Sequence, residues 1–121
     1  MTSLHLYGLK RCSTCVKAMR WLEEHGVAYE FVDYRDQPIG PDTLEQWSNQ
    51  LGGWEKLVNR ASMTWRNLPA ERKTPGSDAE WKSLIAEFPT LIKRPVTVSG
   101  ADVLAVGFNE KKFTELLGKH A

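Results

Sequence analysis

Leu4-His-Leu-Tyr-Gly-Leu-Lys-Arg-Cys-Ser-Thr-Cys15 begins as a short apolar strand and ends in a pair of cysteines. The strand is expected over residues 4–7, a basic turn follows it, and residues 13–25 have the pattern of a helix. The cysteine pair therefore lies where a strand gives way to the first turn of a helix. The stretch thus predicts that the first strand is followed directly by the first helix.

Cys12 is the candidate nucleophile, because it comes just before that helix. A helix N-terminus carries roughly +0.5 of a charge and unpaired backbone N–H groups, and both favour a thiolate. Lys10 and Arg11 add two cations close by in the sequence. Cysteines in such settings have pKa values of ~3.5–7.5 instead of ~8.5, and the thiolate is the reactive form.

Cys15 has two interpretations that the sequence leaves open. It lies one helical turn after Cys12, so it can act as a redox partner that closes a disulfide. It also shares an apolar helix stripe with Ala18, Met19 and Leu22, which predicts a packing role. A zinc site is disfavoured, because the chain has two cysteines and three scattered histidines, whereas a zinc site usually takes four ligands.

Composition limits the class of protein. The 121 residues are expected to form one domain, and 16 basic against 15 acidic residues argue against direct, nonspecific binding to nucleic acid. No apolar run approaches the ~20 residues of a membrane span, and the N-terminus has no secretory signal pattern. We therefore expect a cytoplasmic protein without a membrane partner, in which a Cys-x-x-Cys motif indicates redox chemistry.

The rest of the chain predicts an α/β fold. Residues 27–33 have the composition of a strand, which completes a strand-helix-strand unit with parallel strands. Short helices follow from Pro38, one capped by Asp42 and another opened by a capping box that starts at Ser77. Two strands at 96–99 and 103–106 and a last helix capped by Asn109 end the pattern. The order β-α-β … β-β-α is that of a thioredoxin-like fold with a four-stranded mixed sheet, in one domain over 1–121 with a helical insertion at about 38–90.

Two further segments are candidate parts of the site. Pro95, after Arg94, stands before the third strand, where thioredoxin-like folds commonly have a cis proline facing the nucleophilic sulfur. The alternative is an ordinary trans proline at the start of an edge strand. The stretch around Arg60 mixes cations, hydroxyls and an aromatic residue, so it is either an anion-binding loop or a solvated basic turn.

Three blocks of sequence resemble the arsenate reductase (ArsC) family, and within it the YffB and Spx branch. They are Tyr7-Gly-Leu-Lys-Arg-Cys-Ser-Thr-Cys15, Leu57-Val-Asn-Arg-Ala-Ser-Met-Thr-Trp-Arg66 and Leu91-Ile-Lys-Arg-Pro-Val96. The resemblance implies that Cys12 attacks an oxyanion or a disulfide. It also implies that glutathione and glutaredoxin resolve the adduct, that Arg60 and Arg94 hold the anion, and that no cofactor is bound.

One departure from the family pattern concerns a third arginine. It falls at about Gly107 in this sequence, so a doubly charged oxyanion would lack one of its charge-assisted partners. We therefore expect a glutathione-dependent thiol-disulfide or arsenate-type reductase. The alternative is a non-catalytic regulator of the Spx kind, switched by a disulfide between Cys12 and Cys15 while it binds the α subunit of RNA polymerase.

Overall fold

The computed structural model describes residues 4–117, which form two compact units. One unit contains residues 4–37 and 94–117 and is called the sheet unit. The other contains residues 38–93 and is called the helical unit. Within residues 4–117, no helix is long and apolar enough to cross a membrane.

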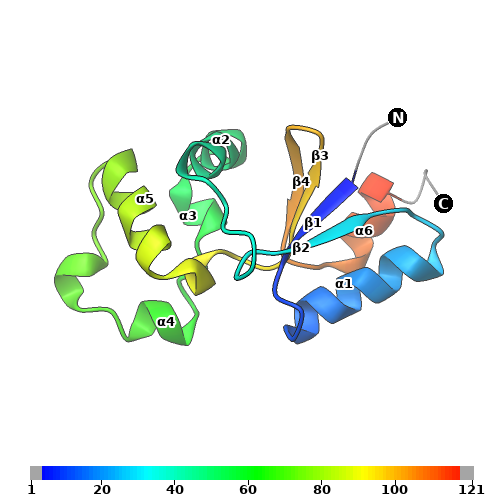
Figure 1. Ribbon diagram of the computed structural model, residues 1–121, viewed down its shortest axis with the longest axis horizontal. Helices are drawn as coiled ribbons and strands as arrows, with labels where there is room; N and C mark the ends of the chain where they lie inside the picture. Colours follow the sequence, from blue (N-terminus) through cyan, green and yellow to red (C-terminus); the bar gives the residue numbers. More distant parts are fainter. Residues whose placement is uncertain (1–3, 118–121) are drawn as a thin grey trace. The chain divides into compact units, whose positions relative to one another are not determined.

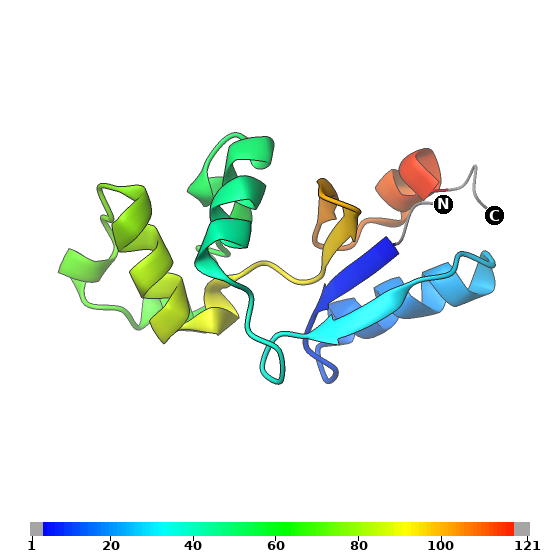
Figure 2. The same ribbon diagram turned by 45° about the horizontal axis from the view of Figure 1, so that its top comes forward.

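The sheet unit contains four strands and two helices (Figure 1). Its strand order is β2-β1-β3-β4, with β1 parallel to β2 and antiparallel to β3, and with β3 antiparallel to β4. In Figure 2, β1 lies between β2 and the β3–β4 hairpin. This is the mixed sheet of a thioredoxin-like fold, so the predicted fold class is confirmed. The elements are β1 Leu4–Gly8, α1 Ser13–Glu24, β2 Glu30–Asp33, β3 Val96–Ser99, β4 Asp102–Val106 and α6 Glu110–Leu117.

One core holds α1 and α6 against the same face of this sheet. Leu6 of β1 and Ala105 of β4 pack with Leu22 of α1 and Phe113 of α6. Trp21 of α1 also joins this core and meets the Phe113 ring edge-on, with ring centroids 5.5 Å apart. Each such large apolar side chain contributes roughly 1.5–3 kcal/mol when fully buried. This packing fixes the start of α1 relative to the end of β1.

The second strand is shorter than predicted. The sequence predicts an extended segment over residues 27–33, but β2 begins at Glu30, opposite His5 of β1. The preceding residues close the end of α1 instead: Gly26 has φ +66°, and the Val27 N–H donates to the Leu22 carbonyl at 2.9 Å. Glycine adopts this left-handed conformation without steric cost, so the turn consumes residues that otherwise suit a strand.

The helical unit is built from short helices around an aromatic centre. The Trp81 ring stacks on Trp54 and on Trp65, with centroids 6.2 and 6.0 Å apart. An isolated bridge joins Val58 to Ile92. The elements are α2 Pro41–Leu51, α3 Trp54–Leu57, α4 Met63–Arg66, the 3₁₀ helices η1 Ala70–Arg72 and η2 Pro89–Leu91, and α5 Asp78–Glu87.

Helix caps follow the sequence in two cases of three. Ser77 Oγ accepts the Glu80 N–H at 3.2 Å, and Asn109 Oδ1 accepts the Lys112 N–H at 3.0 Å, as predicted. The prediction that Asp42 caps α2 is wrong, because the helix begins two residues earlier than a cap at Asp42 would place it. Gly40 is the N-cap and Pro41 takes the first helical position, where its fixed φ and missing N–H are well tolerated.

Candidate active site

Cys12 lies at the junction between β1 and α1, as the sequence predicts. It is the N-cap residue of α1, with φ −75° and ψ 123°. Its N–H donates to the Leu9 carbonyl at 3.1 Å, and its carbonyl accepts the Val16 N–H at 3.0 Å. The thiol is free and half-buried. The backbone therefore holds the sulfur at the start of the helix while leaving it open to solvent on one side.

The pKa of Cys12 is lowered relative to an ordinary thiol. Burial acts to raise this pKa, but the backbone N–H of Cys15 and the guanidinium of Arg94 outweigh it. The Cys15 thiol and the backbone N–H of Thr14 act in the same lowering direction. The N–H groups belong to the first turn of α1, where they have no partner within the helix. The result favours the thiolate, which is the nucleophilic form.

Cys15 has the opposite character. Its side chain is 0% exposed, and burial raises its pKa to about 12. The backbone of Leu9 lowers this pKa in part, while a thiolate at Cys12 raises it. Cys15 is therefore protonated at neutral pH. The two thiols of the motif are distinct: one is poised to react, and the other is packed beneath the motif loop.

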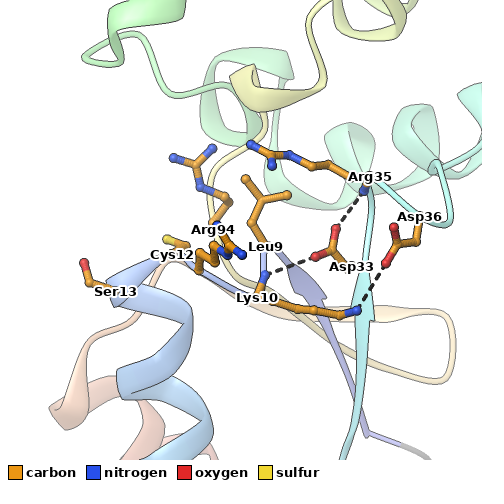
Figure 3. Close-up of a pocket in the computed structure, with 9 residues that line it drawn as sticks. Leu9, Lys10, Cys12, Ser13, Asp33, Arg35, Asp36 and Arg94 are labelled. Carbon is orange, nitrogen blue, oxygen red and sulfur yellow. Dashed lines mark hydrogen bonds and ion pairs between the residues drawn. The ribbon is translucent and has the colours of Figure 1, made fainter.

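The loop that carries Cys12 is tied to the end of β2 through Asp33 (Figure 3). One carboxylate oxygen of Asp33 accepts the Lys10 N–H at 3.1 Å, and the other accepts the Arg35 N–H at 2.9 Å. The Arg35 N–H is the main cause of the lowered pKa of Asp33. The Lys10 ammonium points to Asp36, at 3.3 Å between Nζ and Oδ2. Among charged side chains, Arg94 has the largest effect on the pKa of Cys12, and not Lys10 or Arg11, the two cations that the sequence suggests.

Arg94 reaches the site from the segment before β3. The Arg94–Pro95 peptide bond is cis, as the fold-based expectation has it. Pro95 is buried, and its carbonyl accepts the Gly107 N–H at 2.8 Å. The Arg94 guanidinium donates from Nη1 to the Tyr34 hydroxyl at 3.4 Å. Arg94 is therefore a half-buried cation between a buried phenol and the reactive sulfur.

A cavity of about 600 Å³ opens beside Cys12. Four basic and two acidic side chains line it, so it is polar and carries an excess of positive charge. Such a surface suits an anionic or zwitterionic ligand. No group of three His, Cys, Asp or Glu side chains in residues 4–117 is placed to hold a metal. The lining residues are Leu9, Lys10, Arg11, Cys12, Ser13, Asp33, Arg35, Asp36 and Arg94.

Arg60 belongs to the helical unit. Its guanidinium lies over the Trp65 ring, 5.8 Å from the centroid. The turn around it is ordered by Asn59, whose Oδ1 accepts the Ala61 N–H at 3.0 Å, and by Ser62, which caps α4. The anion-binding role of Arg60 stays a prediction. The other predicted site residues are all in the sheet unit: Lys10, Arg11, Cys12, Cys15, Arg94 and Pro95.

Three residues after or at the end of β2 line the same cavity but are not among the predicted site residues. They are Asp33, Arg35 and Asp36. The sequence contains a signal for them. Neighbouring parallel strands end at the same edge of a sheet, so the residues that follow β2 lie beside those that follow β1.

Comparisons with known proteins find similarity over most of the chain. The ArsC family model matches residues 7–116. An uncharacterised protein of Haemophilus influenzae is 41% identical over 108 residues, which cover 89% of this chain and 93% of that protein. The global transcriptional regulator Spx 1 of Lactococcus lactis is 27% identical over 115 residues, with 94% and 88% covered. A solved structure of a YffB protein has 37% identity and a TM-score of 0.86, and the match covers 95% of this chain and 99% of that one.

Proposed function

Because this chain belongs to the ArsC family, as its three motifs predict, we propose that it is a thiol-dependent reductase with Cys12 as the nucleophile. One observation carries the proposal. Cys12 has a lowered pKa and lines a polar cavity together with Arg94, while the second thiol of the motif is buried and protonated. Cys12 therefore provides the attacking sulfur, and the cavity beside it provides a site for a charged substrate.

The proposed reaction is the reduction of a mixed disulfide of glutathione by a second glutathione. The Cys12 thiolate attacks the glutathione sulfur, a bond forms between the two sulfurs, and the substrate leaves as a thiolate that takes up a proton. A second glutathione thiolate then attacks the glutathione sulfur bound to Cys12. Oxidised glutathione leaves, and the Cys12 thiolate is restored. The net change converts the mixed disulfide and one glutathione thiol into a substrate thiol and oxidised glutathione. The second glutathione is the species that is oxidised, and the proton it loses balances the proton that the substrate thiolate takes up.

Two features support glutathione as the resolving thiol in preference to Cys15. Cys15 is 0% exposed and its pKa is raised to about 12, so it provides almost no thiolate near neutral pH. Glutathione carries two carboxylates and one ammonium, which complement the four basic and two acidic side chains that line the cavity. A glutaredoxin thiol is an equivalent attacking group for the last step. A glutathione-dependent reaction also fits the reducing cytoplasm that we propose as its location.

Disulfide reduction is preferred over arsenate reduction because of residue 107. Arg60 and Arg94 match two anion-binding arginines of the family, but the third falls at about Gly107, which provides no charged side chain. A charge-assisted hydrogen bond is worth about 1.5–3 kcal/mol, so its loss weakens the hold on a doubly charged oxyanion. A carboxylate or a singly charged group needs fewer such partners.

The test is an assay of a glutathionylated peptide with glutathione, followed by mass spectrometry of the protein. We expect a glutathione adduct on Cys12, with activity lost in Cys12→Ser and largely kept in Cys15→Ser. Cys15→Ser is the matched control, because it removes the other thiol of the same motif. Full activity in Cys12→Ser would refute the proposal.

A second candidate function is a redox-switched regulator of transcription. It is favoured by the match to Spx 1 along 94% of this chain, together with the Cys-x-x-Cys motif. In that case Cys12 and Cys15 form a disulfide, and the partner is the α subunit of RNA polymerase. A pull-down with the purified carboxyl-terminal domain of this α subunit tests it. Capture that depends on the redox state of the motif, without reductase activity, would replace the first proposal by this one.

A further inference from the structure

The side chain of Tyr34 is a buried phenol directly after β2. It is 2% exposed, and its backbone N–H donates to the Gly8 carbonyl of β1 at 3.1 Å. This hydrogen bond continues the pairing of the two parallel strands by one residue. The main chain and the packing thus fix the ring, so the position of its hydroxyl is set by the fold.

The Tyr34 hydroxyl accepts a hydrogen bond from the Arg94 guanidinium, with 3.4 Å between the oxygen and Nη1. A phenylalanine would fill the same apolar space without a polar atom to desolvate. The hydroxyl therefore indicates a role beyond packing, because its partner is Arg94, which lines the cavity beside Cys12. The contact spans 60 residues of sequence and joins the end of β2 to the segment before β3.

We propose that Tyr34 is a positioning residue, whose hydroxyl holds the Arg94 guanidinium beside the Cys12 sulfur. An arginine side chain has several rotatable bonds, and only some of its rotamers bring the guanidinium to the thiolate. The Tyr34 hydroxyl is a fixed acceptor for the Arg94 guanidinium, so it selects among these rotamers. The inference rests on the proposed function only in taking Cys12 as the nucleophile.

Electrostatic effects support the same geometry. Burial raises the pKa of Tyr34, Arg94 lowers it, and thiolates at Cys15 and Cys12 raise it. Burial lowers the pKa of Arg94, but Tyr34 and the thiolate of Cys12 raise it, and the pKa is raised overall. The phenol, the guanidinium and the two sulfurs therefore lie within one local field. Tyr34 is expected to stay a neutral phenol that accepts the hydrogen bond and does not ionise.

The experiment measures the rate of Cys12 alkylation by iodoacetamide against pH in a Cys15→Ser background. Tyr34→Phe should shift the profile to higher pH and slow alkylation at pH 7 roughly threefold, because less thiolate is present. Tyr29→Phe is the matched control. It removes a phenol hydroxyl that donates to Glu23 on the surface, at 3.1 Å, and it should leave the profile unchanged.

A second pair of variants separates positioning from a general effect on packing. Arg94→Ala alone should shift the profile in the same direction, and Tyr34→Phe should add nothing once Arg94 is absent. An equal effect of Tyr34→Phe with and without Arg94 would overturn the inference, and so would an unchanged profile. If Cys12 titrates like a free cysteine before any change at Tyr34, both this inference and the proposed nucleophile fail. If the pKa of Cys12 is lowered but Tyr34→Phe does not change it, only the inference about Tyr34 is overturned.

Discussion

Gly8 and Cys15 are packed so closely that a Cβ atom on residue 8 would lie 2.5 Å from the Cys15 sulfur. Real Cβ atoms do not approach a heavy atom to that distance, so residue 8 has to be a glycine as long as Cys15 keeps its position. Gly8 ends β1, and Cys15 is in the first turn of α1. Their contact allows the helix to begin directly against the strand, which places Cys12 at the sheet edge.

We predict that Gly8→Ala destabilises the protein by about 1–3 kcal/mol, through overpacking against the Cys15 sulfur. In a Cys15→Ala background the same change should be nearly neutral, because the next contact, to the Cys15 Cβ atom, is at 3.7 Å. Urea unfolding of the four proteins in this cycle measures the coupling. Gly76→Ala is the matched control, since a Cβ atom there meets nothing within 4 Å. Equal effects of Gly8→Ala in both backgrounds would exclude the proposed clash.

The identity of the cation that acts on Cys12 gives a second prediction. Arg94→Ala should slow the alkylation of Cys12 at pH 7 several-fold, because Arg94 lowers the pKa of that thiol. Lys10→Ala should change the rate by less than about twofold, since the Lys10 ammonium is paired with Asp36 on the exposed rim. The pH profile of alkylation measures both. A larger effect at Lys10 than at Arg94 would contradict this prediction and would support the interpretation made from the sequence, in which the cations next to Cys12 in the chain stabilise its thiolate.

The stability of the protein at high pH provides a third prediction. The pKa of Cys15 is raised to about 12 in the folded protein, above its ordinary value of 9.0. Between these values the folded state binds more protons than the unfolded state, so stability falls as the pH rises, by up to ~1.4 kcal/mol per pH unit. Below pH 8 this thiol adds no pH dependence.

Cys15→Ala removes that contribution. The difference in unfolding free energy between the wild type and Cys15→Ala should therefore narrow by about 1 kcal/mol from pH 8 to pH 10. Val27→Ala is a control, because it truncates a buried side chain that does not titrate. If the wild type and Cys15→Ala lose stability in parallel over this range, the Cys15 thiol ionises freely in the folded state.

Local patterns in the sequence are sufficient for the main elements of the sheet unit. The helix after Cys12, the hairpin of β3 and β4, and the cap at Asn109 each follow from residues close together in the chain. Failures arise where two local preferences compete. Pro41 displaces the predicted cap at Asp42, and the glycine turn at residue 26 removes three residues from the expected second strand.

The site is less predictable, because its geometry depends on contacts between distant residues. Lys10 is two residues from Cys12 in the sequence, but its ammonium pairs with Asp36, which is 26 residues away. The sequence alone does not show which of these two partners the ammonium takes. The contact between Tyr34 and Arg94 leaves no periodic pattern at all. The parallel pairing of β1 with β2 and its antiparallel pairing with β3 bring these residues to one edge of the sheet, so their role follows from the fold.

Residue 107 allows a direct test of what limits oxyanion chemistry. Gly107 has φ +80°, follows β4, and donates its N–H to the Pro95 carbonyl beside Arg94. A Cβ atom there meets nothing within 4 Å, so an arginine has space. The left-handed backbone should cost about 1–2 kcal/mol of stability for any residue other than glycine.

We therefore predict that Gly107→Arg lowers the unfolding free energy by that amount and raises arsenate reductase activity. A gain of ~10-fold corresponds to about 1.4 kcal/mol of added transition-state stabilisation, which is within the range of one charge-assisted contact. Gly107→Ala is the control, because it carries the same backbone cost without the charge, so it should lose stability and gain no activity. Circular dichroism must confirm that each variant is folded. If the wild type already reduces arsenate briskly with glutathione and glutaredoxin, the missing arginine does not limit the reaction, and arsenate reduction replaces disulfide reduction as the proposed activity.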